Sequence, residues 1–213
     1  MRTIVCEKNN GKLSINKEDM DSVVTELSAG RLIVYPTETV YGLGCDPFDE
    51  TAVKRLFMAK RRPFDMAMSI IVQDIAMMEE VAYVDDRAIK LVKEFMPGPL
   101  TLILPKKPVV PNILSASTDE IGIRIPDCNV ALSIVKEFGP VVSTSANVHS
   151  HNSPLTCQDA MKDLGPSVSL YVDGGKSPIG QPSTIIQLTE DEMILIRPGS
   201  LPKERVEAVL NEW

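Results

Sequence analysis

The stretch IGIRIPDCNVALSIVKEFGPVVS, residues 121–143, contains the structural unit from which the fold class follows. Its first five residues, 121–125, form a short and largely apolar run that is typical of a buried strand. Residues 129–138 predict a helix, and Gly139 follows where helices commonly end. Residues 141–143 then predict a second short strand. A helix between two short strands is typical of α/β proteins.

This alternation of helix and strand continues in both directions along the chain. We expect helices at 17–29, 50–60, 86–95, 157–164 and 202–213, of which the first four follow the capping residues Asn16, Asp49, Asp85 and Thr156. We expect further strands at 31–35, 68–73, 101–104, 169–172, 184–188 and 193–196.

The last two predicted strands are joined by a tight acidic turn, which predicts an antiparallel hairpin. Helix–strand alternation combined with an antiparallel pair favours a twisted mixed sheet with flanking helices. We therefore expect a single α/β domain over residues 1–213, with its motifs inside a core of about 15–200.

Composition limits the possible partners. The chain has 213 residues, with 22 Lys and Arg against 29 Asp and Glu, which gives a formal net charge of −7. Proteins that bind nucleic acid over a broad surface are usually basic, so any contact with nucleic acid or phosphate would use a local patch. No apolar run exceeds four residues, whereas a membrane-spanning helix needs about 20. The N-terminus lacks an apolar signal-peptide core, so we expect a cytoplasmic protein with no membrane contact.

The four cysteines form no CxxC motif, so we expect buried thiols rather than a metal or redox centre. His149 and His151 could share one face of a strand. A zinc site needs about four ligands, and the surrounding sequence does not supply the others. We therefore expect no metal site built by the protein.

Five cations fall within nine residues of this acidic chain: Lys54, Arg55, Lys60, Arg61 and Arg62. One interpretation is a solvated helix face with favourable positive charge at the helix C-terminus. The other is an anion site, because Lys60 and Arg62 lie where the helix stops and together suit phosphate or carboxylate. The same cluster supports an alternative function, a module that binds tRNA or double-stranded RNA without catalysis.

Further polar residues lie at the ends of predicted strands, where α/β proteins bind ligands. Arg is almost never fully buried unless paired, so Arg124 is either ion-paired or exposed, or it faces a carboxylate or phosphate in a pocket. Residues 143–147, Ser-Thr-Ser-Ala-Asn, supply neutral donors and acceptors. The chain has no GxGxxG, GxSxG or HExxH motif and no complete P-loop. The site would therefore position anions and polar ligands rather than form a covalent intermediate.

Seven motifs, taken in order, resemble those of the YrdC-like family, the threonylcarbamoyl-AMP synthases, in its single-domain form. They are YPTETVYGLG (35–44), Lys60-x-Arg62-Pro63, PGPLTLIL (97–104), GIRIP (122–126), STSAN (143–147), PSTI (182–185) and RPG (197–199). Arg61, Met66, Ile71 and His151 stand where many members have other residues.

The resemblance implies a twisted sheet around a large cavity. It also implies a nucleotidyltransferase that joins L-threonine, bicarbonate and ATP into threonylcarbamoyl-AMP and pyrophosphate, with Mg²⁺ bridging the ATP phosphates. The product would serve the threonylcarbamoyladenosine modification of tRNA through a downstream threonylcarbamoyl transferase complex. Direct contact with tRNA would be weak. Relatives that transfer carbamoyl groups to another acceptor carry zinc-finger domains, for which this chain has no motif.

The resemblance further implies a nucleotide side and a threonine side of the cavity. Lys60 and Arg62 would be catalytic and would neutralise the ATP phosphates, and Asn147 and Arg197 would also bind the nucleotide. The residues around threonine or its carbamate would be Thr37, Arg124, Ser145 and Ser183, with Arg124 facing a carboxylate.

Overall fold

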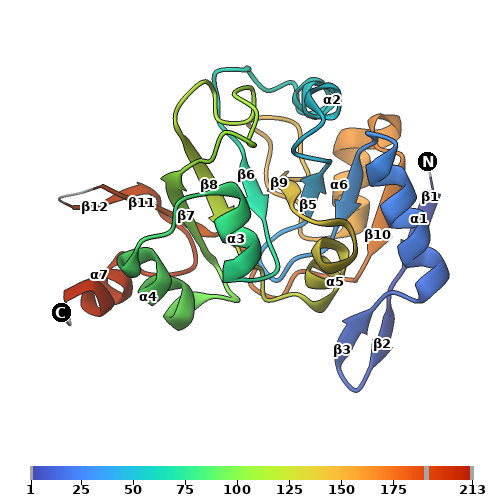
Figure 1. The fold of residues 1–213 in the computed structure, drawn as a ribbon. Coiled ribbons are helices and arrows are strands. Elements are labelled where there is room, and N and C mark those ends of the chain that lie inside the picture. Colours follow the sequence, from blue (N-terminus) through green and yellow to red (C-terminus); the bar gives the residue numbers. More distant parts are fainter. Residues whose placement is uncertain (1, 190–191, 212–213) are drawn as a thin grey trace.

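The computed structural model describes residues 2–189 and 192–211, and within them ten strands form one mixed sheet (Figure 1). Their order is β1-β10-β4-β5-β9-β6-β8-β7-β11-β12, with both parallel and antiparallel neighbours. The predicted α/β class with a mixed sheet is therefore confirmed. The strands are β1 Arg2–Val5, β4 Ile33–Tyr35, β5 Gly42–Gly44, β6 Ser69–Ile71, β7 Leu100–Pro105, β8 Glu120–Arg124, β9 Val141–Ser145, β10 Leu170–Asp173, β11 Thr184–Leu188 and β12 Met193–Arg197.

Helices flank this sheet, and a separate hairpin of β2 Glu7–Asn9 and β3 Lys12–Ser14 extends from its N-terminal end (Figure 1). The four predicted caps are confirmed, because the side chains of Asn16, Asp49, Asp85 and Thr156 each accept a backbone N–H of the first helical turn. The helices are α1 Lys17–Ser28, α2 Glu50–Lys60, α3 Ile75–Val81, α4 Asp86–Phe95, α5 Asn129–Phe138, α6 Cys157–Leu164 and α7 Lys203–Asn211.

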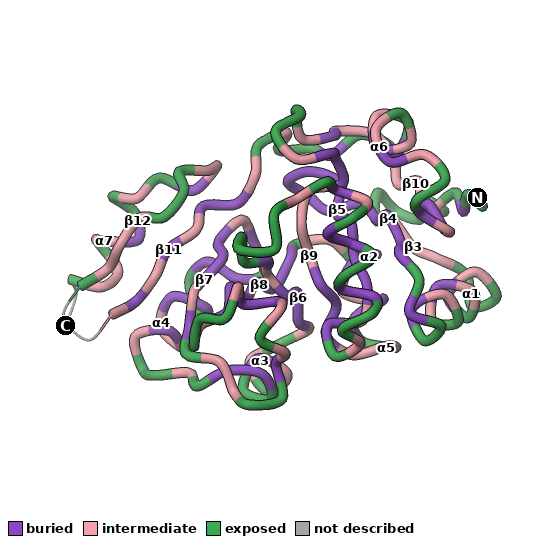
Figure 2. Tube along the Cα trace, turned by 90° about the horizontal axis from the view of Figure 1, so that it is seen from above, coloured by how far each residue is buried: buried purple, intermediate pink, exposed green. Residues whose placement is uncertain are grey.

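Alternation along the central strands separates two apolar cores. In β4, Ile33 and Tyr35 pack with α1 and α5, whereas Val34 belongs to the larger core that includes α2. Figure 2 shows the central strands as mostly buried and the outer loops as mostly exposed. The central part of the sheet is thus covered on both faces.

Several elements were not predicted. Strand β1 is an edge strand in which only Ile4 is buried, so it has no clear alternating pattern. The hairpin of β2 and β3 is largely exposed, and α3 has only seven residues. The antiparallel hairpin of β11 and β12 is confirmed. Its turn at 190–191 and the predicted helix end at 212–213 lie outside the described residues.

Strand β5 was also missed, because two of its three residues are glycine, which is depleted in strands. Its pairing with β4 on one side and β9 on the other leaves no room for a side chain at Gly42 or Gly44. A Cβ at Gly44 would lie 2.7 Å from the carbonyl oxygen of Val142. This tight strand turns the chain back and brings residues 36–41 to the centre of the sheet.

None of the described helices combines the length and the apolar character needed to cross a membrane.

Candidate active site

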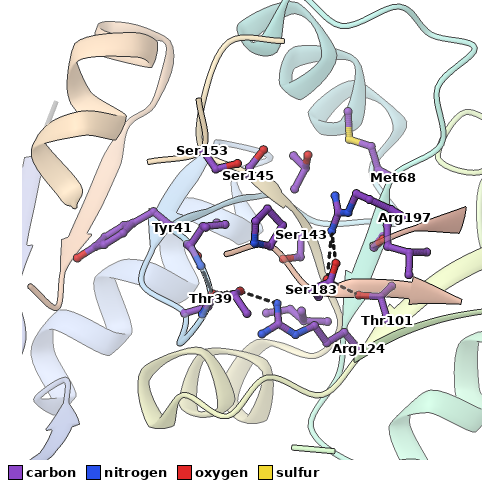
Figure 3. Close-up of a pocket in the computed structure, with 18 of the residues that line it drawn as sticks. Thr39, Tyr41, Met68, Thr101, Arg124, Ser143, Ser145, Ser153, Ser183 and Arg197 are labelled. Atoms are coloured by element: carbon purple, nitrogen blue, oxygen red, sulfur yellow. Dashed lines mark hydrogen bonds between the residues drawn. The ribbon is translucent and has the colours of Figure 1, made fainter. Parts of the chain in front are cut away.

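A cavity opens at the centre of the sheet, between the loop after β4 and the ends of strands β6 to β9, β11 and β12 (Figure 3). Hydroxyl groups and three arginines dominate its lining. Six of the eight predicted site residues line it: Thr37, Arg62, Arg124, Ser145, Ser183 and Arg197. Lys60 and Asn147 do not line the cavity. Lining residues that were not predicted individually include Thr39, Tyr41, Met68, Ser69, Thr101 and Ser153.

Arg124 projects from the end of β8 and combines both interpretations that the sequence left open. It is 7% exposed and forms an ion pair with Glu38, yet it also lines the cavity. Its Nε donates to the carbonyl of Gly98 at 3.0 Å, and its Nη1 donates to Thr39 Oγ1 at 2.9 Å. The guanidinium is therefore held in one orientation from three directions.

Arg62 and Arg197 supply the cavity with positive charge that no carboxylate neutralises within residues 2–189 and 192–211. Arg62 donates through Nη2 to the carbonyl of Ala67 at 2.8 Å. Arg197, at the cavity rim, donates through Nη2 to the carbonyl of Ser183 at 2.8 Å. Burial lowers the pKa of Arg62, and burial together with the charges of Arg124 and Arg62 lowers the pKa of Arg197. The arrangement attracts anions.

Lys60 lies behind the cavity wall rather than in it. It is the last residue of α2 and is 1% exposed. Its Nζ donates to the carbonyls of Ser145 at 2.5 Å and Asn147 at 2.7 Å, while its own carbonyl accepts from His149 N at 2.7 Å. Burial, assisted by the charge of Arg62, lowers the pKa of Lys60 to about 7. In this structure Lys60 holds the backbone after β9, and its contact with ATP phosphates stays a prediction.

Asn147 is likewise directed at the backbone. Its Nδ2 donates to the carbonyls of Val148 at 2.9 Å and His151 at 2.8 Å, and its buried Oδ1 has no partner. His151 in turn lies 3.1 Å from both carboxylate oxygens of Asp163 through its Nδ1. Sequence reasoning left the role of His151 open, and the structure places it in the network that shapes this loop.

Two pairs of hydrogen-bonded hydroxyls also line the cavity. Ser183 Oγ and Thr101 Oγ1 lie 2.8 Å apart (Figure 3). Thr37 Oγ1 and Thr39 Oγ1 lie 2.9 Å apart. Thr101 and Thr39 were not singled out, although both lie in quoted motifs. Thr101 could have been found by its polar side chain in an otherwise apolar strand.

Within the described residues, no group of three or more His, Cys, Asp or Glu is arranged to hold a metal ion. The cysteine prediction is confirmed for Cys45 and Cys157, which are buried free thiols, whereas Cys6 and Cys128 are only half-buried.

Comparison with known proteins relates this geometry to one family. The family model Sua5_yciO_yrdC, described as "Telomere recombination", matches residues 25–199. Threonylcarbamoyl-AMP synthase of Pyrococcus abyssi is 40% identical over 185 residues, which is 86% of this chain and 54% of the relative. The enzyme of the same name from Pseudoalteromonas translucida is 35% identical over 173 residues, 77% of this chain and 90% of the relative.

Solved structures agree with these relatives. The crystal structure of P. abyssi Sua5 complexed with L-threonine superposes with a TM-score of 0.94 at 36% identity, covering 100% of this chain and 62% of that one. The structure of Escherichia coli YciO gives a TM-score of 0.82 at 26% identity, and the match covers 94% of this chain and 96% of YciO. This chain therefore spans about half to three fifths of the P. abyssi protein.

Proposed function

The chain belongs to the Sua5/YciO/YrdC family, and from this we propose that it makes threonylcarbamoyl-AMP and pyrophosphate from L-threonine, bicarbonate and ATP. One observation carries the proposal: three arginines and a set of hydroxyls line one cavity, in a chain that superposes on a Sua5 complexed with L-threonine. The carbamoyl-transferring alternative is not supported by any comparable observation.

The reaction has two parts, and both bring anions together. The threonine amine and bicarbonate condense to a carbamate with loss of water. A carbamate oxygen then attacks the α-phosphorus of ATP, the bond to the β-phosphate oxygen breaks, and pyrophosphate leaves. Fixed cations favour this step because they stabilise the charge that develops on the phosphates. Positioning the two reactants supplies much of the remaining acceleration.

We assign Arg62 and Arg197 to the phosphates, because both line the cavity without a neutralising carboxylate. Arg124 would receive the threonine carboxylate, with Thr37, Ser145 and Ser183 around the rest of the amino acid. Lys60 and Asn147 would act from behind the wall by holding the backbone on the nucleotide side.

Among the described residues, the lining contains no Asp or Glu that could offer a carboxylate to Mg²⁺. The ion enters the proposal only as a counter-ion of the ATP phosphates. Delivery of the product to a tRNA-modifying transferase complex, and a cytoplasmic location, stay predictions.

The test is incubation with ATP, L-threonine and bicarbonate, followed by mass spectrometry for threonylcarbamoyl-AMP and an assay of pyrophosphate. We expect Arg62→Ala and Arg197→Ala each to lower turnover by about 10²-fold or more, as loss of a transition-state contact does. Arg61→Gly is the matched control, because Arg61 is adjacent but does not line the cavity. Pyrophosphate release that does not depend on threonine would contradict the proposal.

A further inference from the structure

Glu38 is a buried carboxylate beside the cavity, and the proposed reaction gives it no role. Its side chain is 7% exposed, its Oε1 accepts a hydrogen bond from Arg124 Nη2, and its Oε2 has no partner. A buried carboxylate is unfavourable unless the charge is paired and hydrogen-bonded. Only one carboxylate oxygen of Glu38 is hydrogen-bonded, and its partner is Arg124. This contact indicates that the role of Glu38 lies in its effect on Arg124.

The hydrogen bonds of Arg124 leave a defined pair of donors. A guanidinium has five N–H groups, and Arg124 uses one on Nε, one on Nη1 and one on Nη2. One N–H remains on each terminal nitrogen. Because Arg124 lines the cavity, these remaining N–H groups can donate charge-assisted hydrogen bonds to a carboxylate bound there.

Glu38 also divides the cavity by charge. Within the described residues, Arg62 and Arg197 have no carboxylate partner, whereas Arg124 is neutralised by Glu38. Phosphates gain most at the two unpaired arginines. An amino acid has no net charge, so it can use the directed N–H groups of Arg124 where a phosphate finds no excess positive charge.

The Gly- and Pro-rich loop at 174–182 fixes the backbone that carries Glu38. The Ser177 hydroxyl donates to the carbonyl of Thr37 at 2.9 Å. Backbone N–H groups of Ile179 and Gly180 donate to the carbonyls of Glu38 at 2.9 Å and Thr39 at 3.0 Å. Three consecutive carbonyls are thus held, and the Glu38 carboxylate can reach Arg124 from a rigid support.

We propose that Glu38 is a positioning residue, which fixes the Arg124 guanidinium and cancels its charge so that the two remaining N–H groups select the carboxylate of the amino-acid substrate. This inference rests on the proposed function and adds to it the basis on which the cavity separates threonine from phosphate groups.

The experiment measures L-threonine and ATP binding separately by calorimetry for the wild type, Glu38→Gln and Glu38→Ala. We expect the threonine Kd to rise at least tenfold in Glu38→Ala and less in Glu38→Gln, whose amide oxygen can still accept from Arg124. The Kd of ATP should stay within twofold or fall. Thr39→Val removes a second contact of Arg124. It should also raise the Kd of threonine without raising that of ATP.

Glu120→Gln is the matched control. Glu120 is a carboxylate on β8, the strand that also carries Arg124, and it does not line the cavity. Its carboxylate oxygens accept from Gln187 Nε2 at 2.8 and 2.7 Å. Glu120→Gln should change neither Kd. Equal weakening of both ligands, or unchanged or tighter threonine binding in Glu38→Ala, would overturn the role of Glu38 alone. A wild type that binds no threonine would overturn the proposed function, and this inference with it.

Discussion

The Lys60 side chain is the residue-scale feature with the clearest pH signature. Its pKa falls from 10.5 to about 7 because burial disfavours the charged form. Between these values the unfolded chain holds a proton that the folded chain does not, so folding stability rises with pH. We expect the unfolding free energy of the wild type relative to Lys60→Met to rise from pH 7 to pH 9, by at most about 1.4 kcal/mol per pH unit.

Denaturant unfolding of both proteins across this range measures the slope. Other groups that titrate there, such as the cysteines, are common to both proteins and cancel in the difference. Lost hydrogen bonds in Lys60→Met shift the whole curve without changing its slope. Parallel curves for the two proteins would show that Lys60 keeps its proton in the folded state.

Arg61 ends α2 in the left-handed conformation, with φ of 50° and ψ of 39°. A side chain in that region costs about 1–2 kcal/mol, which glycine avoids. Arg61 is exposed, and its guanidinium forms no hydrogen bond or ion pair with the described residues. We expect Arg61→Gly to raise the free energy of unfolding by about 0.5–1 kcal/mol. Lys54→Gly, inside the same helix, should lower it by about 1 kcal/mol. If both variants lower the free energy of unfolding, Arg61 does not have the left-handed conformation.

The sequence predicts which residue types belong to the cavity better than it predicts what each side chain contacts. Arg124 was identifiable because an arginine inside an apolar strand must find a partner, but the sequence could not say that the partner is Glu38, 86 residues away. The sequence predicts Lys60 as a phosphate ligand, but it does not reveal that this lysine at a helix end turns inward onto two carbonyls.

At the scale of elements, β5 depends on the absence of a side chain at each of its two glycines, Gly42 and Gly44. A Cβ at Gly44 would lie 2.7 Å from both Val142 O and Val141 Cγ1, so β5 would have to move away from β9. We expect Gly44→Ala to lower the free energy of unfolding by about 1–3 kcal/mol, as overpacking does, and to weaken threonine binding because β5 carries the loop at 36–41.

Gly139→Ala provides the contrast for that measurement. Its Cβ would meet nothing within 4 Å, and only its φ of 106° resists a side chain. It should destabilise without changing threonine affinity, because it lies between α5 and β9 on the side of the α1 core. If both variants lower stability but neither changes binding, β5 does not position the loop.

Strong periodicity made the long elements predictable, whereas short elements held by tertiary contacts were not. The four capped helices α1, α2, α4 and α6, and also α5, all begin within a residue of the prediction. Strands β1 and β5 depend on neighbours distant in sequence, β10 and β9 respectively. Nothing local in their residues indicates that pairing, which is why the order of strands could not be derived from the sequence.

For the whole molecule, the five cations at 54–62 no longer form a nucleic-acid surface. Lys54 pairs with a glutamate one turn earlier, and Arg55 donates to a backbone carbonyl at 2.7 Å. Lys60 is buried and Arg62 lines the cavity. Of the five, Arg61 alone makes no side-chain hydrogen bond or ion pair with the described residues, in a chain whose net charge is −7.

We therefore expect tRNA or double-stranded RNA to bind weakly, with a shallow dependence on salt. Each phosphate contact contributes about −0.7 to −0.9 to the slope of log K against log salt, so the one available cation of this cluster adds no more than about −1 to the slope. A filter-binding titration between about 50 and 500 mM salt measures it, and Arg61→Gly should flatten the slope further. A slope of about −4 or steeper would require several phosphate contacts. A single exposed cation on an acidic surface cannot produce so steep a salt dependence, so this result would support the RNA-binding alternative.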